Sequence, residues 1–293
     1  MTIPAGILVA FILAAATGQG ARAAENKLAV VAAENFYGDV ARQIGGDRVA
    51  VTSILNNPDQ DPHLFETTAT VARNLADARI VIFNGADYDP WMEKLLSASP
   101  RPKRTAIIAA TLVNRKAGDN PHLWYDPATM PAVAKALAAT LSKADPAHAA
   151  DFATRLKTFL ASLEAIDNKI AQLRAKYSGT PVTATEPVFG YMAQALGLTM
   201  RNESFQRATM NDTEPSAKDI AAFEDDLTGR KVRLVLYNKQ VTGKLAQRLV
   251  DLAHKKDVPV VGVTETEPAN TSYQGWMLGQ LGEVEKALAE TRR

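Results

Sequence analysis

Apolar and polar positions follow two different spacings along this chain, which predicts strands and helices in alternation. Short, almost wholly apolar runs are typical of buried strands, and longer stretches with apolar residues three and four positions apart are typical of amphipathic helices. The expected strands span 27–33, 49–55, 79–83, 105–109, 181–184, 232–236 and 258–263. The expected helices span 36–44, 67–78, 90–96, 127–141, 188–196, 216–227, 245–255 and the stretch from 273 onward. Such alternation predicts an α/β fold with parallel-rich sheets.

One further helical stretch, 145–177, is longer than any other. Asp145 is expected to cap its start, with Pro146 in its first turn. At about 1.5 Å per residue this helix would span on the order of 45 Å, more than a small domain is across. We therefore expect two α/β lobes, 24–144 and 178–293, joined by one long backbone helix at 145–177. A long amphipathic core helix inside a single domain is the alternative.

The first 23 residues are expected to be a cleavable export signal. Their apolar run is followed by Ala21-Arg22-Ala23, a typical small-residue cleavage site. An N-terminal membrane anchor is the alternative, although the run is short for a spanning helix. The chain contains no cysteine, so disulfides, thiolate ligands and a lipid-modified cysteine are not expected. We expect a periplasmic protein that is not lipid-anchored.

Charge and composition narrow the class of partner. The chain has 33 Lys and Arg against 32 Asp and Glu, a net charge of +1, which provides no electrostatic basis for binding nucleic acid. With 46% hydrophobic residues among 293, the protein is expected to be globular and large enough for two domains.

Two of the four histidines lie in similar sequence contexts. These are Asp61-Pro62-His63-Leu64-Phe65 and Asn120-Pro121-His122-Leu123-Trp124. Both contexts are expected to be loops, with a proline that stiffens the backbone, in the position where α/β proteins bind ligands. Imidazole suits divalent transition metals, and without thiols the remaining ligands must be carboxylates or more histidines. Glu186 and Glu265 each follow an expected strand of the second half. Two partly buried histidines bonded to backbone remain the alternative.

Four segments resemble the zinc and manganese solute-binding proteins of ABC importers. They are Glu34 to Asp39, Asn57 to Glu66, Asn84 to Trp91 and Asn120 to Pro127. In that family each lobe supplies two ligands and a long helix joins the lobes. The resemblance implies His63 and His122 as ligands from the first lobe, with Glu186, which begins Glu-Pro-Val-Phe-Gly-Tyr, from the second. The family's fourth ligand is usually an Asp; here Glu265 takes its place, with Glu267 as the fallback.

The resemblance also implies a function. The chain would be a binding component, not an enzyme, that captures a divalent metal and delivers it to an ABC permease in the inner membrane, and we expect a monomer. Two glutamates make a harder ligand set than three histidines, which places Mn²⁺ slightly ahead of Zn²⁺, with Fe²⁺ possible. Asp61, Asn120 and Asp126 are expected to orient the imidazoles, and Trp124 to keep water from the site.

Two other functions remain open from the residues. Two histidines and a glutamate could hold a catalytic zinc that activates water, which would make the chain a secreted mononuclear zinc hydrolase. The chain has no HExxH motif, which argues against the common form of such enzymes. The same scaffold could also bind chelated iron or an organic solute.

Overall fold

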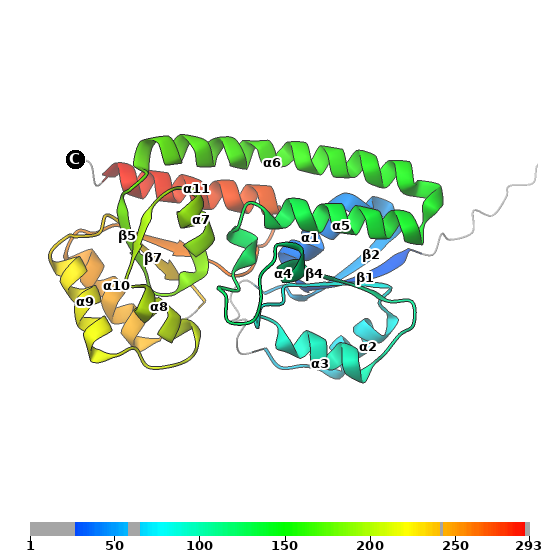
Figure 1. Ribbon diagram of the computed structural model, residues 1–293, viewed down its shortest axis with the longest axis horizontal. Helices are drawn as coiled ribbons and strands as arrows, with labels where there is room; N and C mark the ends of the chain where they lie inside the picture. The colour runs from blue at the N-terminus through cyan, green and yellow to red at the C-terminus, as the bar shows by residue number, and fades with distance from the viewer. Residues whose placement is uncertain (1–26, 58–64, 241–242, 291–293) are drawn as a thin grey trace, which may run out of the picture.

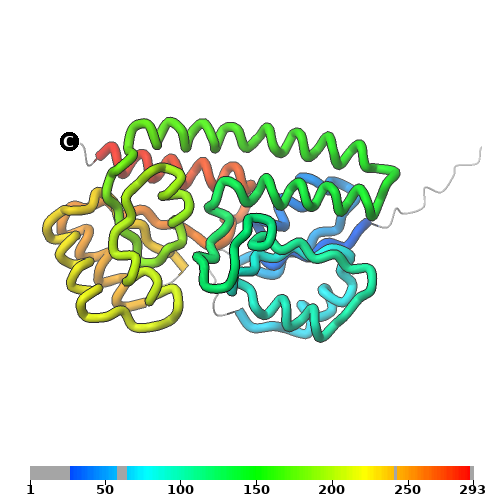
Figure 2. The backbone as a smooth tube through the Cα atoms, viewed as in Figure 1, coloured from blue at the N-terminus to red at the C-terminus, as the bar shows by residue number. Residues whose placement is uncertain are grey.

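Two lobes lie side by side in the computed structural model, which describes residues 27–57, 65–240 and 243–290 (Figure 1). One helix, α6 (Ala149–Tyr177), runs along the same side of both lobes. The last helix, α11 (Tyr273–Glu290), packs beside it, as the tube in Figure 2 also shows. The expected export signal lies outside the described residues. The arrangement is the expected α/β architecture with a long connecting helix.

The N-terminal lobe contains a four-stranded, all-parallel sheet in the order β2-β1-β3-β4. Its strands are β1 (Leu28–Glu34), β2 (Val49–Leu55), β3 (Ile80–Phe83) and β4 (Thr105–Ile108). Its helices are α1 (Asn35–Gly45), α2 (Ala69–Asp77), α3 (Pro90–Ala98), α4 (Ala109–Leu112) and α5 (Thr129–Ala144). All four residues of β3 are buried, because helices cover both faces of a parallel sheet.

The C-terminal lobe repeats this plan with the strand order β6-β5-β7-β8, again all parallel. Its strands are β5 (Pro181–Ala184), β6 (Thr199–Arg201), β7 (Val235–Asn238) and β8 (Val260–Val263). Its helices are α7 (Gly190–Ala195), α8 (Glu203–Met210), α9 (Ala217–Thr228) and α10 (Lys244–Lys255).

Along the described residues of both lobes, single 3₁₀ turns occur at η1 (Gly46–Arg48), η3 (Leu123–Tyr125), η4 (Pro146–His148) and η5 (Pro187–Phe189).

Some expected elements differ from the structure. Neither β6 nor α8 was expected, because β6 is a three-residue edge strand without a buried run and offers no apolar pattern. The strand expected at 232–236 lies at Val235–Asn238, although Val232 and Leu234 are buried as well. The lobe boundaries expected at 144 and 178 remain predictions.

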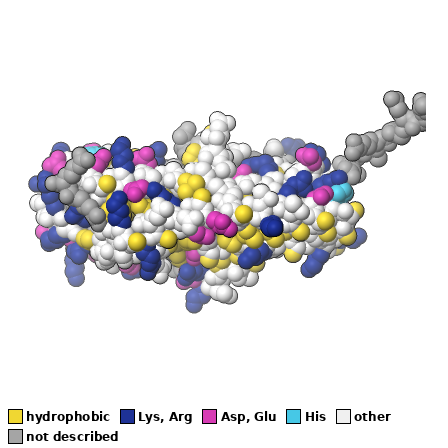
Figure 3. All heavy atoms as spheres, turned by 90° about the horizontal axis from the view of Figure 1, so that it is seen from above, with side chains coloured by type: hydrophobic (Ala, Val, Ile, Leu, Met, Phe, Trp, Pro, Cys, Tyr) yellow, Lys and Arg dark blue, Asp and Glu magenta, His cyan; other side chains and the backbone are white. Residues whose placement is uncertain are grey.

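Helix α6 is amphipathic along its whole length. Its 29 residues bury one face through Phe152, Phe159, Leu163, Ile166, Ile170, Leu173 and Tyr177, which recur at the three- and four-residue spacing of a single helix stripe. The face of the molecule on which α6 lies shows interspersed side chains of both charges (Figure 3). Asp145 and Pro146 stand at the start of the turn η4, which leads directly into α6, so the expected positions of cap and proline hold. The side chain of Asp145 makes no capping hydrogen bond, and its Oδ2 lies 2.7 Å from His148 Nδ1. The α-helix itself begins at Ala149.

The hydrophobic core is continuous from one lobe to the other. The ring of Tyr125 contacts those of Phe189, at 5.1 Å between centroids, and Trp276, at 5.6 Å. Tyr125 Oη also donates to Thr264 O at 3.0 Å, and Tyr273 Oη donates to Trp124 O at 2.9 Å. Aromatic packing and buried hydrogen bonds thus hold the lobes together. None of the described helices has both the length and the apolar character needed to cross a bilayer.

Candidate metal centre

His122 is fully buried in the loop that precedes η3. Its Nδ1 lies 2.6 Å from Asn120 Oδ1. The other end of the Asn120 side chain, Nδ2, donates to Pro187 O at 2.8 Å, and since a carbonyl can only accept, Oδ1 is the atom that faces the imidazole. Asn120 therefore holds the proton on Nδ1 and leaves the lone pair of Nε2 for a ligand.

Glu186 and Glu265 approach His122 from the other lobe. Glu186 follows β5 and is 3% exposed, and Glu265 follows β8 and is fully buried. One potential ligand atom from each of the three residues lies within 4.8 Å of the other two. His122 Nε2 and Glu265 Oε2 are 3.6 Å apart. Three of the four expected ligands therefore meet between the lobes.

The sheet topology explains why these residues meet. In the C-terminal sheet, β6 is added on one side of β5, and β7 and β8 are added on the other side. The direction in which strands are added therefore changes between β5 and β7. Open α/β sheets bind ligands beyond the carboxyl ends of strands at such a switch point. Glu186 follows β5 there, and Glu265 follows β8 at the same edge. The site is thus at the place where the fold favours ligand binding.

Asn238, the last residue of β7, belongs to this centre although its role was not expected. Its Nδ2 donates to Glu186 Oε2 at 2.8 Å and to Glu265 Oε1 at 2.5 Å. Its Oδ1 accepts from Gln240 N at 3.0 Å, which fixes the orientation of the amide. The signal in the sequence was a polar residue at the carboxyl end of a buried strand, the same signal that indicated the glutamates.

Aromatic rings enclose the imidazole. Trp124 is fully buried, with its ring centroid 5.3 Å from that of His122. The ring of Tyr88, which was not expected, has its centroid 4.9 Å from that of Trp124 and 6.2 Å from that of His122. Burial, followed by the carboxylates of Glu265 and Glu34, raises the pKa of Tyr88 well above its ordinary value. These rings lower the local dielectric constant, which strengthens the electrostatic interactions of charged groups at the site.

The remaining expected residues lie elsewhere or are not described. His63 and Asp61 are outside the described residues. Asp126 Oδ1 accepts from Ala128 N at 3.0 Å and its Oδ2 lies 3.6 Å from Arg115 Nη2. This carboxylate therefore contacts Arg115 and the backbone just before α5 and does not orient the ring of His122, which corrects the expectation.

Glu267 is set apart from the three clustered ligands. Its backbone N donates to Asn35 Oδ1 at 2.9 Å, and its carbonyl accepts from Asn35 Nδ2 at 2.7 Å. Its side chain lines a separate polar cavity of about 460 Å³. Burial, and then Asp39, raises the pKa of Glu267 to about 8, against a lowering effect of Arg42. Of the two glutamates after β8, Glu265 lies with His122 and Glu186.

A second buried carboxylate pair lies in the N-terminal lobe. Glu34, at the end of β1, is fully buried and faces Asp89. Asp89 accepts from Asn84 N at 2.6 Å and Gly85 N at 2.8 Å. Burial raises the pKa of Asp89 to about 6, and burial together with Asp89 raises the pKa of Glu34 well above its ordinary value.

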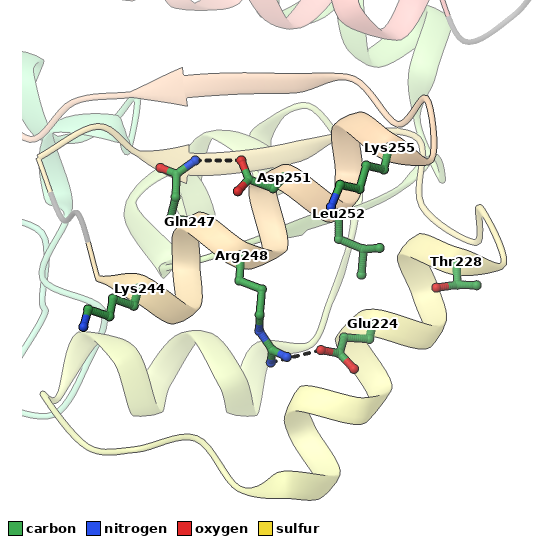
Figure 4. A pocket seen from close by; sticks show the side chains of 8 residues that line it. All are labelled: Glu224, Thr228, Lys244, Gln247, Arg248, Asp251, Leu252 and Lys255. Carbon is green, nitrogen blue, oxygen red and sulfur yellow. Dashed lines mark hydrogen bonds and ion pairs between the residues drawn. The ribbon is translucent and has the colours of Figure 1, made fainter.

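The cavity between α9 and α10 is larger, about 660 Å³, but contains none of these ligands (Figure 4). Two pairs of polar groups lie in its wall: Arg248 Nη2 lies 3.0 Å from Glu224 Oε1, and Gln247 Nε2 donates to Asp251 Oδ1 at 2.9 Å. Cavity size therefore does not identify the candidate metal centre. The buried imidazole and carboxylates identify it.

The three clustered residues fit a divalent transition metal. One imidazole nitrogen and two carboxylates are typical ligands of Zn²⁺, Mn²⁺ and Fe²⁺. Bonds of about 2.0–2.2 Å would bring the ligand atoms to within about 4.4 Å of each other. Since the atoms already lie within 4.8 Å, a metal needs only a small closing movement.

Comparisons with known proteins identify relatives that bind metals. The model of a family described as zinc-uptake complex component A, periplasmic, matches residues 30–287. The manganese-binding lipoprotein MntA of Bacillus subtilis (strain 168) is 26% identical over 308 residues, covering 97% of this chain and 99% of the relative. The iron ABC transporter substrate-binding lipoprotein MtsA of Streptococcus pyogenes serotype M1 is 24% identical over 210 residues, covering 65% and 66%.

A solved structure has the same fold. The periplasmic zinc binding protein TroA of Treponema pallidum superimposes with a TM-score of 0.76 at 21% identity, covering 90% of this chain and 99% of that one. The expected fold class, two parallel α/β lobes with a long connecting helix, is thereby confirmed.

The comparisons also correct one expectation. We expected a protein without a lipid anchor, but both relatives named above are lipoproteins, which contradicts that prediction. The prediction depended on the cysteine count alone, and the count of one residue type does not establish how a protein is held at a membrane. A location outside the cytoplasm is supported, because the family is described as periplasmic.

The family match settles the class of protein. Its members are metal-binding components of ABC importers and not enzymes, so the expectation of a non-enzymatic transport protein is confirmed. With the family model matching residues 30–287, this chain belongs to the periplasmic zinc-uptake component A family of metal-binding proteins.

Proposed function

We propose that this protein captures a divalent transition metal between its lobes and delivers it to an ABC permease in the inner membrane. The observation that carries the proposal is the buried group of His122, Glu186 and Glu265, whose ligand atoms lie within 4.8 Å of one another. His63, from the matching motif, is proposed as the fourth ligand. We also propose that the binding protein acts as a monomer.

Mn²⁺ is the proposed cargo, slightly ahead of Zn²⁺. Two carboxylates supply harder oxygen ligands than the histidines they replace, and oxygen-rich sites suit Mn²⁺ better. Zn²⁺ nevertheless binds more tightly than Mn²⁺ at almost any such site. Selectivity must therefore be judged from how the ratio of the two affinities changes between variants.

The hydrolase alternative requires an open coordination position for water. A site with four protein ligands leaves none, and the family consists of transport proteins. The proposed function therefore explains both the clustered ligands and the relatives. A binder of chelated iron or an organic solute would not require three ionisable side chains buried against one another.

The test is metal titration of the metal-free protein by calorimetry. His122→Ala and Glu186→Gln are each expected to weaken Zn²⁺ and Mn²⁺ binding by more than the roughly 10–100-fold typical of losing an outer partner. His254→Ala is the matched control, since His254 is exposed on α10. Unchanged metal affinity in both ligand variants would rule the proposal out.

The same titration separates the two candidate glutamates. Glu265→Gln is expected to weaken binding as much as Glu186→Gln does, because Glu265 lies 3.6 Å from His122 Nε2. Glu267→Gln is expected to bind nearly as the unaltered protein does. The reverse order would assign the ligand position of Glu265 to Glu267.

A further inference from the structure

We propose that Asn238 limits how many oxygen atoms the two glutamates offer to the metal, and thereby lowers the coordination number of the metal. This inference depends on the proposed metal site and goes beyond it, because it assigns a role in selectivity to a residue that is not a ligand. Asn238 lies at the end of β7, between the loops that carry Glu186 and Glu265.

The geometry engages one oxygen of each carboxylate. Asn238 Nδ2 has two hydrogens, and its two acceptors are Glu186 Oε2 at 2.8 Å and Glu265 Oε1 at 2.5 Å. An oxygen that accepts an amide hydrogen is a weaker metal ligand. Each glutamate is therefore directed to bind through its other oxygen, and for Glu265 that atom, Oε2, is the one 3.6 Å from His122 Nε2.

The amide cannot easily turn away. Asn238 is 2% exposed, and its Oδ1 accepts from Gln240 N at 3.0 Å. A flipped amide would place an N–H group against that backbone N–H and present an oxygen to two carboxylates. Gln240 in turn accepts from Glu265 N through Oε1, at 2.5 Å, so the same segment fixes both the amide and the loop of Glu265.

One oxygen per glutamate has a consequence for the metal. When His122 and the two glutamates each provide a single atom, the coordination number of the metal stays low, and Zn²⁺ readily adopts such low, tetrahedral coordination. Mn²⁺ prefers more oxygen ligands, which two-oxygen binding by the glutamates would supply. In a ligand set that otherwise suits Mn²⁺, Asn238 opposes that preference.

The test compares the unaltered protein with Asn238→Ala and Asn238→Ser. Absorption of bound Co²⁺ reports geometry, since tetrahedral Co²⁺ absorbs visible light far more strongly than five- or six-coordinate Co²⁺. We expect a strong spectrum for the unaltered protein and a weak one for Asn238→Ala. Asn238→Ser keeps one O–H donor, which can hold only one carboxylate, and is expected to be intermediate.

Affinities provide a second readout. In Asn238→Ala, Zn²⁺ affinity is expected to fall about 10–100-fold, as for other outer partners, while Mn²⁺ affinity changes less, so the Mn²⁺ to Zn²⁺ affinity ratio rises. Asn202→Ala is the control for simple destabilisation, because Asn202 Nδ2 also donates to a carboxylate, Asp226 Oδ2 at 3.0 Å. It should leave the Co²⁺ spectrum and the ratio unchanged.

The outcomes separate this inference from the proposed function. An unaltered protein that binds no metal would overturn the proposed function itself. Tight metal binding with the same Co²⁺ spectrum and the same affinity ratio in all Asn238 variants would overturn only the role of Asn238. A change of spectrum in Asn202→Ala equal to that in Asn238→Ala would also overturn it.

Discussion

At the scale of single residues, the amide of Asn238 joins two of the proposed metal ligands, Glu186 and Glu265, through hydrogen bonds. His122 could be found because its motif matches that of His63, and Glu186 because it follows a strand in a recognisable context. Asn238 also follows an expected strand, but no motif marks it. Its role arises from the pairing of β7 with both β5 and β8, which local sequence patterns do not report.

Tyr88 and Asp126 also show that sequence position does not reveal which side chains lie near the imidazole. Tyr88 lies near it unexpectedly, and Asp126 was expected to orient it but does not. Tyr88 lies against Trp124 through a long-range contact that its sequence context does not indicate. Asp126, near His122 in sequence, contacts Arg115 and the backbone just before α5 instead. Closeness along the chain was therefore a poor guide to which polar side chain reaches the imidazole.

The Glu34–Asp89 pair predicts how stability depends on pH. Both carboxyl groups have raised pKa values in the folded protein, that of Asp89 about 6, so the folded chain retains protons that the unfolded chain loses. Stability from this pair is complete at low pH and is lost as pH rises from about 4 through 6 and above. Glu34→Gln removes one of these ionisations and is expected to flatten that decline.

Urea unfolding of the metal-free protein and of Glu34→Gln, at several values between about pH 5 and pH 8, measures this difference. The variant should gain stability relative to the unaltered protein as pH rises. Parallel pH profiles would show that the pair does not change its protonation on folding.

At the scale of elements, long buried and amphipathic stretches could be predicted, and short edge elements could not. Helix α6 was expected from 145–177 and runs over Ala149–Tyr177, because its apolar stripe is long and regular. Strand β6 has three residues with exposed ends, so its position depends on pairing with β5. Pairing partners are fixed by the tertiary fold and leave no periodic signal.

The buried apolar face of α6 predicts that alanine substitutions at neighbouring positions differ greatly in their effect on the free energy of unfolding. Phe159 is 2% exposed within the shared core, so Phe159→Ala is expected to lower the free energy of unfolding by about 3–5 kcal/mol. Lys157, two residues away, is exposed, and Lys157→Ala should change it by about 0.5 kcal/mol or less. Chemical denaturation measures both; similar losses would mean that α6 does not use this face for packing.

At the scale of the whole molecule, the lobes are joined by more than one helix. The rings of Tyr125, Phe189 and Trp276 pack across the seam, and the Asn35 side chain forms two hydrogen bonds with the backbone of Glu267. Wide opening would expose this core and break those bonds. Metal capture should therefore involve shifts of loops near the site.

Solution X-ray scattering tests this view of the whole molecule. The radius of gyration is expected to differ by on the order of 1 Å or less between metal-free and metal-loaded protein, the scale of pre-organised binding. The required closure is small because the ligand atoms already lie within 4.8 Å. A large contraction on loading would show hinge closure instead.

The parallel sheet fixes the distance between the backbone positions of the two glutamates in the proposed metal site. Glu186 follows β5, Glu265 follows β8, and β7 lies between these two strands. Neighbouring strands are about 4.8 Å apart, so the roots of the two side chains are separated by backbone hydrogen bonding and only their tips converge, on the amide of Asn238. An ion that required wider spacing would have to displace the short loops that these strands anchor and break their bonds to Asn238, so the sheet that builds the lobe also limits the size of ion that it accepts.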